Sequence, residues 1–184
     1  MGETVQAPSS FSAVVVGLGQ IGMGYDLHLP EASHVLSHVR ALRRHGDFRL
    51  LAAADPDYAL QKRFAAENGL PAYRGVVDLL GQHQPDVVVL ACPTASHPEV
   101  LATVLENSAP RAILCEKPLA ISLAESEGMI AACERAGIPL FVNFIRRADP
   151  GVREVQERIR DGRISGPLKA VVWYSKGMQH NGSH

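Results

Sequence analysis

Short apolar runs alternate with helical apolar patterns along most of the chain. The runs are rich in valine, leucine and alanine, which is typical of parallel strands that are buried on both faces. Between them, apolar residues such as Val35, Val39 and Leu42 recur at helical spacing. The expected strands are 12–16, 48–54, 72–73, 86–91, 112–115 and 139–143, and the expected helices are 33–45, 58–67, 76–80, 97–106 and 121–136. This alternation predicts an α/β fold with a doubly wound parallel sheet.

The first expected strand leads directly into a Gly-x-Gly-x-x-Gly motif. In a βα unit, Gly17 permits the tight turn, Gly19 lets the backbone approach a pyrophosphate, and Gly22 lets the next helix pack closely on the strand. The phosphates would lie at the helix N-terminus, where free N–H groups and the helix dipole favour negative charge. Because the motif follows a strand and opens the alternation, we interpret it as a dinucleotide site rather than an ordinary turn. The predicted cofactor-binding residues are Gly17, Gly19, Gln20, Ile21 and Gly22.

Asp55 follows the second expected strand. An acid at this position accepts hydrogen bonds from the adenosine ribose and repels a 2′-phosphate, and no Arg or Lys follows directly, so NAD is favoured over NADP. The offset from Gly22 is 33 residues (55 − 22), whereas about 20 is usual. The excess fits an inserted loop over residues 23–33. Alternatively, Asp55 only caps the helix that begins near Asp57, and the two roles are compatible.

Glu116-Lys117-Pro118 leaves the fifth expected strand at the same edge of the sheet. Packing explains charged residues poorly at this position. Pro118 keeps Lys117 out of the helical region, and a desolvated lysine beside other cations can have a lowered pKa and transfer protons. The alternative interpretation is a surface ion pair at a strand end.

The composition narrows the partners of the protein. The 184 residues, 46% of them hydrophobic, are enough for one domain and the beginning of another. A formal net charge of −1 gives no reason to expect nucleic acid or an anionic membrane as a partner. No apolar run has the length of a membrane span, and residues 1–10 lack the basic and apolar regions of a secretory signal. We expect residues 1–10 to form a disordered lead-in.

Three cysteines and two histidine pairs are candidates for other chemistry. The odd number of cysteines in apolar segments predicts buried free thiols in a reducing compartment, hence a cytoplasmic protein. A catalytic Cys92 at a strand end is an alternative, although packing explains it better. The pairs His34/His38 and His180/His184 have the i, i+4 spacing of zinc ligands. Without a third ligand in view, we expect no metal.

Three motifs together resemble the Gfo/Idh/MocA oxidoreductases, which include glucose-fructose oxidoreductase and inositol dehydrogenase. They are the glycine motif, Glu-Lys-Pro after the fifth strand, and Asn143-x-x-Arg146-Arg147 after the sixth. The resemblance extends over the whole chain. It implies NAD(P)-dependent hydride transfer at a sugar or polyol carbon, with Lys117 contacting the substrate and helping proton transfer.

The same resemblance implies further site residues. Glu116 would lie near the nicotinamide ribose, and the nicotinamide side would be lined by Pro93, Thr94 and His97. The family pattern Asp-x-x-x-His is matched by His184 as base or substrate orienter, but His180 stands where the Asp would be, which leaves the proton relay open. From its fork geometry, Arg147 could bind a substrate phosphate or carboxylate, as in a nucleotide-sugar.

The C-terminal part reads as an incomplete second domain. Asp149 and Pro150 predict a helix start, and residues 168–174 alternate as one strand before the sequence ends. One strand cannot form a stable sheet. We therefore expect a Rossmann domain over residues 11–144 and the incomplete start of a substrate and oligomerisation domain over 145–184. Either the second domain is truncated or its sheet is completed by another chain, and a homo-oligomer is expected if it is completed.

The sequence thus predicts an NAD-dependent oxidoreductase for a sugar, polyol or nucleotide-sugar. The alternative is a non-catalytic nucleotide-binding module or fragment that acts as a sensor or scaffold subunit. Turnover distinguishes the two.

Overall fold

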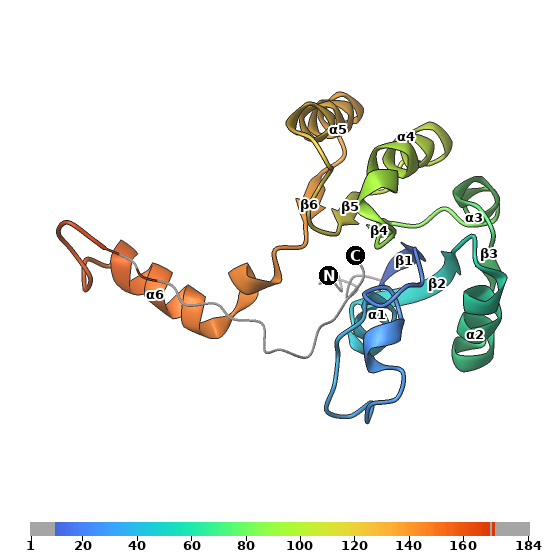
Figure 1. Cartoon of the computed structure of the whole chain (residues 1–184), viewed down its shortest axis with the longest axis horizontal. Helices are drawn as coiled ribbons and strands as arrows, with labels where there is room; N and C mark the ends of the chain where they lie inside the picture. Colours follow the sequence, from blue (N-terminus) through green and yellow to red (C-terminus); the bar gives the residue numbers. More distant parts are fainter. Residues whose placement is uncertain (1–9, 170, 172–184) are drawn as a thin grey trace, which may run out of the picture. The chain divides into compact units, whose positions relative to one another are not determined.

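The computed structural model describes residues 10–169 and 171. Contacts divide the chain into two units, Met1–Phe144 and Ile145–His184. The first unit holds a six-stranded sheet in the order β3-β2-β1-β4-β5-β6, in which every pairing is parallel (Figure 1). Its strands are β1 (Phe11–Val16), β2 (Phe48–Ala54), β3 (Ala72–Tyr73), β4 (Val87–Leu90), β5 (Ala112–Cys115) and β6 (Leu140–Val142). The predicted doubly wound parallel sheet is confirmed.

Helices cover both faces of this sheet. They are α1 (His38–Arg44), α2 (Tyr58–Asn68), α3 (Val76–Gln82), α4 (His97–Asn107) and α5 (Leu123–Ala136). One core cluster joins α1 and α2 to the sheet face that carries Ala13 and Val15. The other joins α3, α4 and α5 to the face that carries Val14 and Val16. Because successive residues of β1 are buried on opposite faces, the strand reads as a continuous apolar run.

The strand order places a switch point between β1 and β4. The chain runs outward from β1 to β3, then crosses back to β4 on the other side of β1. Ligands of such sheets bind outside the carboxyl ends of the strands at this point. At the switch point, a backbone bond extends past the strand ends, from the Ala91 N–H to Val16 O (2.7 Å). Similar bonds flank it, from the Gly17 N–H to Ala54 O (2.8 Å) and from the Glu116 N–H to Leu90 O (2.9 Å).

The helix expected over residues 33–45 begins five residues later, at His38. Ser37 caps it, with its side chain accepting a hydrogen bond from the Arg40 N–H (3.3 Å). Val35 therefore lies outside the helix and is 46% exposed, whereas Val39 and Leu42 are buried as expected. Apolar spacing alone could not locate this start, because the loop before it contains apolar residues at compatible positions.

A loop interrupts the first helix immediately after the glycine motif. A helical turn forms there, with the Met23 N–H donating to Gly19 O, and the N–H of His38 then donates to Ile21 O (3.0 Å). His38 follows Ile21 by 17 residues (38 − 21), where a continuous helix would need about four. The insertion is thus about 13 residues, which matches the excess in the offset to Asp55.

Asp26 closes the base of this loop. It lies in the short 3-10 helix η1 (Gly24–Asp26) and is buried. Its carboxylate accepts the N–H groups of Leu36 (2.7 Å) and Ser37 (2.9 Å) and the Ser37 hydroxyl (2.7 Å). Burial tends to raise the pKa of Asp26, but these donors and nearby Arg40 hold it below its ordinary value of 3.8. The loop is therefore built around an ionised carboxylate.

Capping residues set the limits of two other helices. The Asp57 carboxylate accepts the Ala59 N–H (2.7 Å) and begins α2, which ends at left-handed Gly69. Ser122 and Glu125 form the expected capping box, so α5 begins two residues after the expected start.

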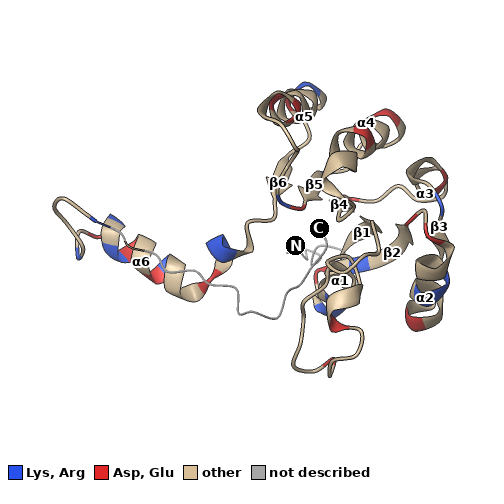
Figure 2. Ribbon diagram, in the orientation of Figure 1, with Lys and Arg blue, Asp and Glu red and all other residues tan. Residues whose placement is uncertain are grey.

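The second unit contains a 3-10 turn, η3 (Ile145–Ala148), and the helix α6 (Pro150–Arg160). As expected, Asp149 caps α6 by accepting the Gly151 N–H (2.8 Å), and Pro150 occupies the first helical position. Acidic and basic residues both occur along α6 (Figure 2). Of the strand expected over 168–174, residues 168, 169 and 171 are not in a strand and the others lie outside the described residues. No helix among the described residues is long and apolar enough to cross a membrane.

Candidate functional site

The glycine loop (residues 17–22) leaves no room for side chains at two of its three glycines. A Cβ on Gly17, where φ is +98°, would lie 2.5 Å from Cys92 N and 2.6 Å from Ala91 C. A Cβ on Gly22 would collide with the Gly17 carbonyl oxygen. At Gly19 a Cβ would meet nothing within 4 Å. The loop is therefore closely packed on the sheet side and open at Gly19, where a phosphate would approach.

Asp55 lies directly beneath this loop and is 8% exposed. Its Oδ2 accepts the Leu18 N–H (2.7 Å), and its Oδ1 accepts the Asp57 N–H (2.8 Å). A carboxylate has roughly four acceptor positions, so these bonds leave capacity for a ribose diol. The N-cap of α2 is Asp57, so the capping role that the sequence also allows for Asp55 belongs to its neighbour.

The segment after β4 contains the 3-10 turn η2 (Thr94–Ser96), which leads into α4. Pro93 is exposed and Thr94 is partly exposed. The His97 ring is 0% exposed, with Nε2 3.0 Å from Cys92 O and Nδ1 3.0 Å from Leu119 O. The His97 ring thus connects the loop after β4 to the loop after β5. Both ring nitrogens are occupied, so neither is open to a ligand.

The three cysteines are free. Cys115 and Cys133 are buried, whereas Cys92 is partly exposed. Burial raises the pKa of the Cys92 thiol to about 11, and Asp55 also raises it. A thiol with such a pKa is almost entirely protonated at neutral pH, which disfavours a nucleophilic Cys92.

Glu116 is the centre of a hydrogen-bonded group that the sequence did not reveal. Its Oε1 accepts hydrogen bonds from His38 Nε2 (2.8 Å) and Asn143 Nδ2 (2.6 Å), and its Oε2 accepts one from the Lys117 N–H (3.3 Å). Burial tends to raise the pKa of Glu116, but the donors of His38, Asn143 and Lys117 lower it below its ordinary value of 4.5. The site thus contains an ionised, mostly buried carboxylate.

The sequence suggests His38 as a zinc ligand with His34, and it places Asn143 in a family motif after the sixth expected strand. In the structure, His38 pairs with Glu116, whereas His34 Nδ1 lies 2.9 Å from the Ser33 hydroxyl. Among residues 10–169 and 171, no three His, Cys, Asp or Glu side chains lie together as metal ligands would. In the sequence, His38 is a polar residue near a helix start and Asn143 is a polar residue at a strand end. Neither position indicates that its side chain bonds to Glu116.

Lys117 is exposed and follows Glu116 at the carboxyl end of β5, with its peptide bond to Pro118 in the cis form. No acidic side chain of the described residues lies within ion-pair distance of its ammonium group. Among the described residues, Lys117 therefore does not form the surface ion pair that is the alternative interpretation of this segment. The desolvation expected for Lys117 is not provided by the described residues either.

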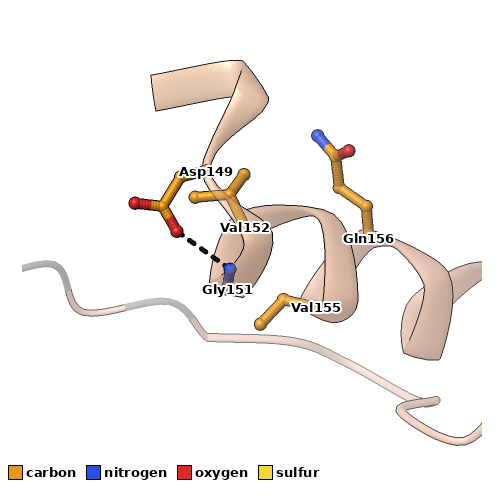
Figure 3. A pocket seen from close by; sticks show the side chains of 5 residues that line it. All are labelled: Asp149, Gly151, Val152, Val155 and Gln156. Carbon is orange, nitrogen blue, oxygen red and sulfur yellow. Dashed lines mark hydrogen bonds between the residues drawn. The ribbon is translucent and has the colours of Figure 1, made fainter. Parts of the chain in front are cut away.

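The remaining predicted residues lie in the second unit. Arg147 is an exposed residue of η3, and His180 and His184 lie outside the described residues. A hollow of about 400 Å³ lies beside α6 and is lined by Asp149, Gly151, Val152, Val155 and Gln156 (Figure 3). It contains none of the predicted catalytic or cofactor-binding residues.

A family model described as "Oxidoreductase family, NAD-binding Rossmann fold" matches residues 11–144. The chain belongs to the Gfo/Idh/MocA family. Within this family it is 33% identical to the myo-inositol dehydrogenase Hyg17 of Streptomyces leeuwenhoekii over 83% of the chain and 42% of the relative. It is also 33% identical to the D-apiose dehydrogenase of Paraburkholderia graminis, over 72% of the chain and 35% of the relative.

Solved Gfo/Idh/MocA structures have the same fold. The WlbA dehydrogenase from Bordetella pertussis, crystallised with NADH and UDP-GlcNAcA, aligns with a TM-score of 0.72 and 26% identity, over 84% of this chain and 41% of that one. The chain therefore spans less than half the length of these relatives.

Proposed function

We propose that the chain is the cofactor-binding part of an NAD-dependent oxidoreductase that transfers a hydride to or from a carbon of a sugar, polyol or nucleotide-sugar. The observation that carries this proposal is the bond between the Asp55 carboxylate and the Leu18 N–H inside the glycine loop. It fixes an acceptor for ribose hydroxyls against the segment that would hold the pyrophosphate. Family membership supports the reaction class.

The glycine loop fits a dinucleotide. Its open side at Gly19 admits a phosphate to the backbone, and the first N–H groups of the helical turn that follows suit a negative charge. Packing requires glycine at positions 17 and 22, which give the loop its shape. We propose that all five residues Gly17, Gly19, Gln20, Ile21 and Gly22 form the cofactor loop, with the closest approach of the phosphates at Gly19.

The preference for NAD over NADP rests on Asp55. Its remaining acceptor positions suit a diol, and its negative charge repels a 2′-phosphate. Pro93 and Thr94 lie on the adjoining loop after β4, where they are available to the nicotinamide half. We propose that His97 acts through this loop, because its ring is enclosed between two carbonyl groups.

Lys117 is assigned to the substrate. Its exposed side chain can hydrogen-bond a substrate hydroxyl. As an ammonium group it can give a proton to the carbonyl oxygen when that carbon is reduced, and as a free amine it can take the hydroxyl proton when that carbon is oxidised. When bound, the nicotinamide supplies the hydride acceptor or donor. His184, His180 and Arg147 complete the proposed substrate site, and a homo-oligomer is proposed for the completed second domain. The free thiols suit a cytoplasmic location.

Calorimetric titration of NADH and NADPH into the chain tests the cofactor role. We expect saturable binding with NADH preferred, and a loss of at least about tenfold in affinity for Gly19→Ala, because its Cβ occupies the phosphate approach. Gly46→Ala is the matched control, since a Cβ there also meets nothing within 4 Å. Both variants should unfold at the wild-type urea concentration. Absence of binding by the wild type contradicts the cofactor role.

Turnover tests the reaction. Nicotinamide absorbance, followed with panels of sugars, polyols and nucleotide-sugars, should change with at least one substrate, and Lys117→Met should abolish that change while NADH still binds. The full-length protein is required, because the chain spans less than half of its relatives. Cofactor binding without turnover on any panel would favour the non-catalytic binding module.

A further inference from the structure

The Glu116 carboxylate receives donors from three separate segments. His38 begins α1, 78 residues before Glu116, and Asn143 follows β6, 27 residues after it. The third donor is the N–H of Lys117 itself. The side chains of His38 and Glu116 are only 11% and 9% exposed. The carboxylate is therefore held from the α1 side and the β6 side at once.

The charge state of Glu116 fixes the direction of these bonds. An ionised carboxylate only accepts hydrogen bonds, so His38 must carry its proton on Nε2. His38 Nδ1 has no hydrogen-bond partner among the described residues and is not one of their buried unpaired atoms, so solvent reaches it. Burial raises the pKa of the preceding Cys115 thiol to about 12, so it is neutral and adds no charge beside Glu116.

Lys117 is adjacent to this carboxylate in the chain but does not form an ion pair with it in the described structure. A negative charge that moves closer to an ammonium group stabilises its charged form. An ammonium group paired with Glu116 would be less available to a substrate hydroxyl. The donors that occupy Glu116 therefore bear directly on what Lys117 can do.

We propose that His38 and Asn143 are positioning residues for Lys117, because they hold the Glu116 carboxylate away from the Lys117 ammonium group and so leave that group free for substrate. The proposal rests on the proposed function only in assigning Lys117 to the substrate. It accounts for the hydrogen bonds that His38 and Asn143 donate to Glu116.

The rate at which Lys117 is acylated tests this directly, because only the free amine reacts. Peptide mass spectrometry from about pH 7 to about pH 10 gives the apparent pKa of this lysine, with Lys62 and Lys169 as internal references. In His38→Leu the freed carboxylate should raise that pKa, so that acylation near pH 8 slows about three- to tenfold. His38→Gln keeps an N–H donor at similar reach and should stay within about twofold of the wild type.

Asn143→Leu removes the other donor and provides an independent test, with the same expected direction. Melting curves identify variants that do not fold. A purely structural role would lower the melting temperature and leave the apparent pKa of Lys117 unchanged. The proposal is overturned if folded His38→Leu and Asn143→Leu acylate at the wild-type rate, or if Gln at position 38 behaves like Leu. The measurement needs no cofactor, so a failure of NADH binding refutes the proposed function separately.

Discussion

Two carboxylates follow buried strands at the same edge of the sheet, and they are held in different ways. Asp55, after β2, is bonded to two backbone N–H groups, those of Leu18 and Asp57. Glu116, after β5, is bonded mainly to the side chains of His38 and Asn143. The backbone donors are present in any sequence that forms this turn. The side-chain donors exist only because His and Asn occupy those two positions.

Because their donors differ, the two carboxylates should have different roles, Asp55 in stability and Glu116 in the environment of Lys117. Removal of Asp55 leaves a buried N–H group that cannot move away, whereas His38 and Asn143 can rotate toward water when Glu116 is removed. Substitution of Asp55 should therefore mainly lower the free energy of unfolding. Substitution of Glu116 should mainly change the environment of Lys117.

The substitution with the largest expected effect on stability is Gly17→Ala, in the glycine loop that Asp55 contacts. The new Cβ would overlap the backbone of Ala91 and Cys92 and would occupy a positive φ of +98°. We expect a loss of about 3 kcal/mol or more in the free energy of unfolding, since overpacking costs about 1–3 and a left-handed residue about 1–2 kcal/mol. Urea unfolding measures it, with Gly46→Ala as the control, which should cost less than about 1 kcal/mol. An unchanged midpoint for Gly17→Ala would contradict the tight packing of the loop.

The pair Asp55→Ala and Glu116→Ala tests the comparison itself. We expect Asp55→Ala to cost about 2–3 kcal/mol, because the buried Leu18 N–H loses its acceptor, and Glu116→Ala to cost about 1 kcal/mol. Both are measured by urea unfolding at neutral pH. A cost for Glu116→Ala equal to or above that of Asp55→Ala would refute the distinction between backbone and side-chain donors.

Asp26 extends the comparison to a third carboxylate. Like Asp55 it accepts backbone N–H groups, here from Leu36 and Ser37 at the base of the inserted loop. Asp26→Ala should therefore cost about 2 kcal/mol and open the loop to proteolysis. Asp47→Ala, at an exposed aspartate, is the control and should change neither property. Rapid cleavage within residues 27–36 of the variant alone is the expected signature.

The dependence of stability on acid pH tests the role of Glu116 further. The pKa of Glu116 is lower in the folded protein than its ordinary value of 4.5, so the folded state binds this proton less readily than the unfolded one. Its contribution to stability is therefore complete above that ordinary value and is lost as the pH falls through the folded pKa. Glu116→Gln should lose less stability than the wild type between about pH 5 and about pH 3. Parallel acid curves for the two proteins would show that Glu116 is not held as the structure indicates.

Most of the fold could be predicted from local patterns. Residues 48–54 form β2 as predicted, because an apolar run of this kind satisfies a strand buried on both faces. The start of α1 could not be placed, since Asp26 and Ser37 decide it through a contact between residues 11 apart. The sequence predicts that Asp55 lies at the carboxyl end of a strand. It does not predict the bond to the Leu18 N–H, because this bond joins the end of β2 to the turn after β1.

The sequence by itself determined the alternation of strands and helices, the glycine motif and the acids that follow the strands, because these depend on spacing along the chain. It determined which residue types stand at the carboxyl edge of the sheet. Only the tertiary structure decided that His38 and Asn143 meet at Glu116, and that Asp26 closes the inserted loop. A hydrogen bond requires two groups within about 3 Å, and neither spacing nor composition specifies which distant side chains the fold brings that close.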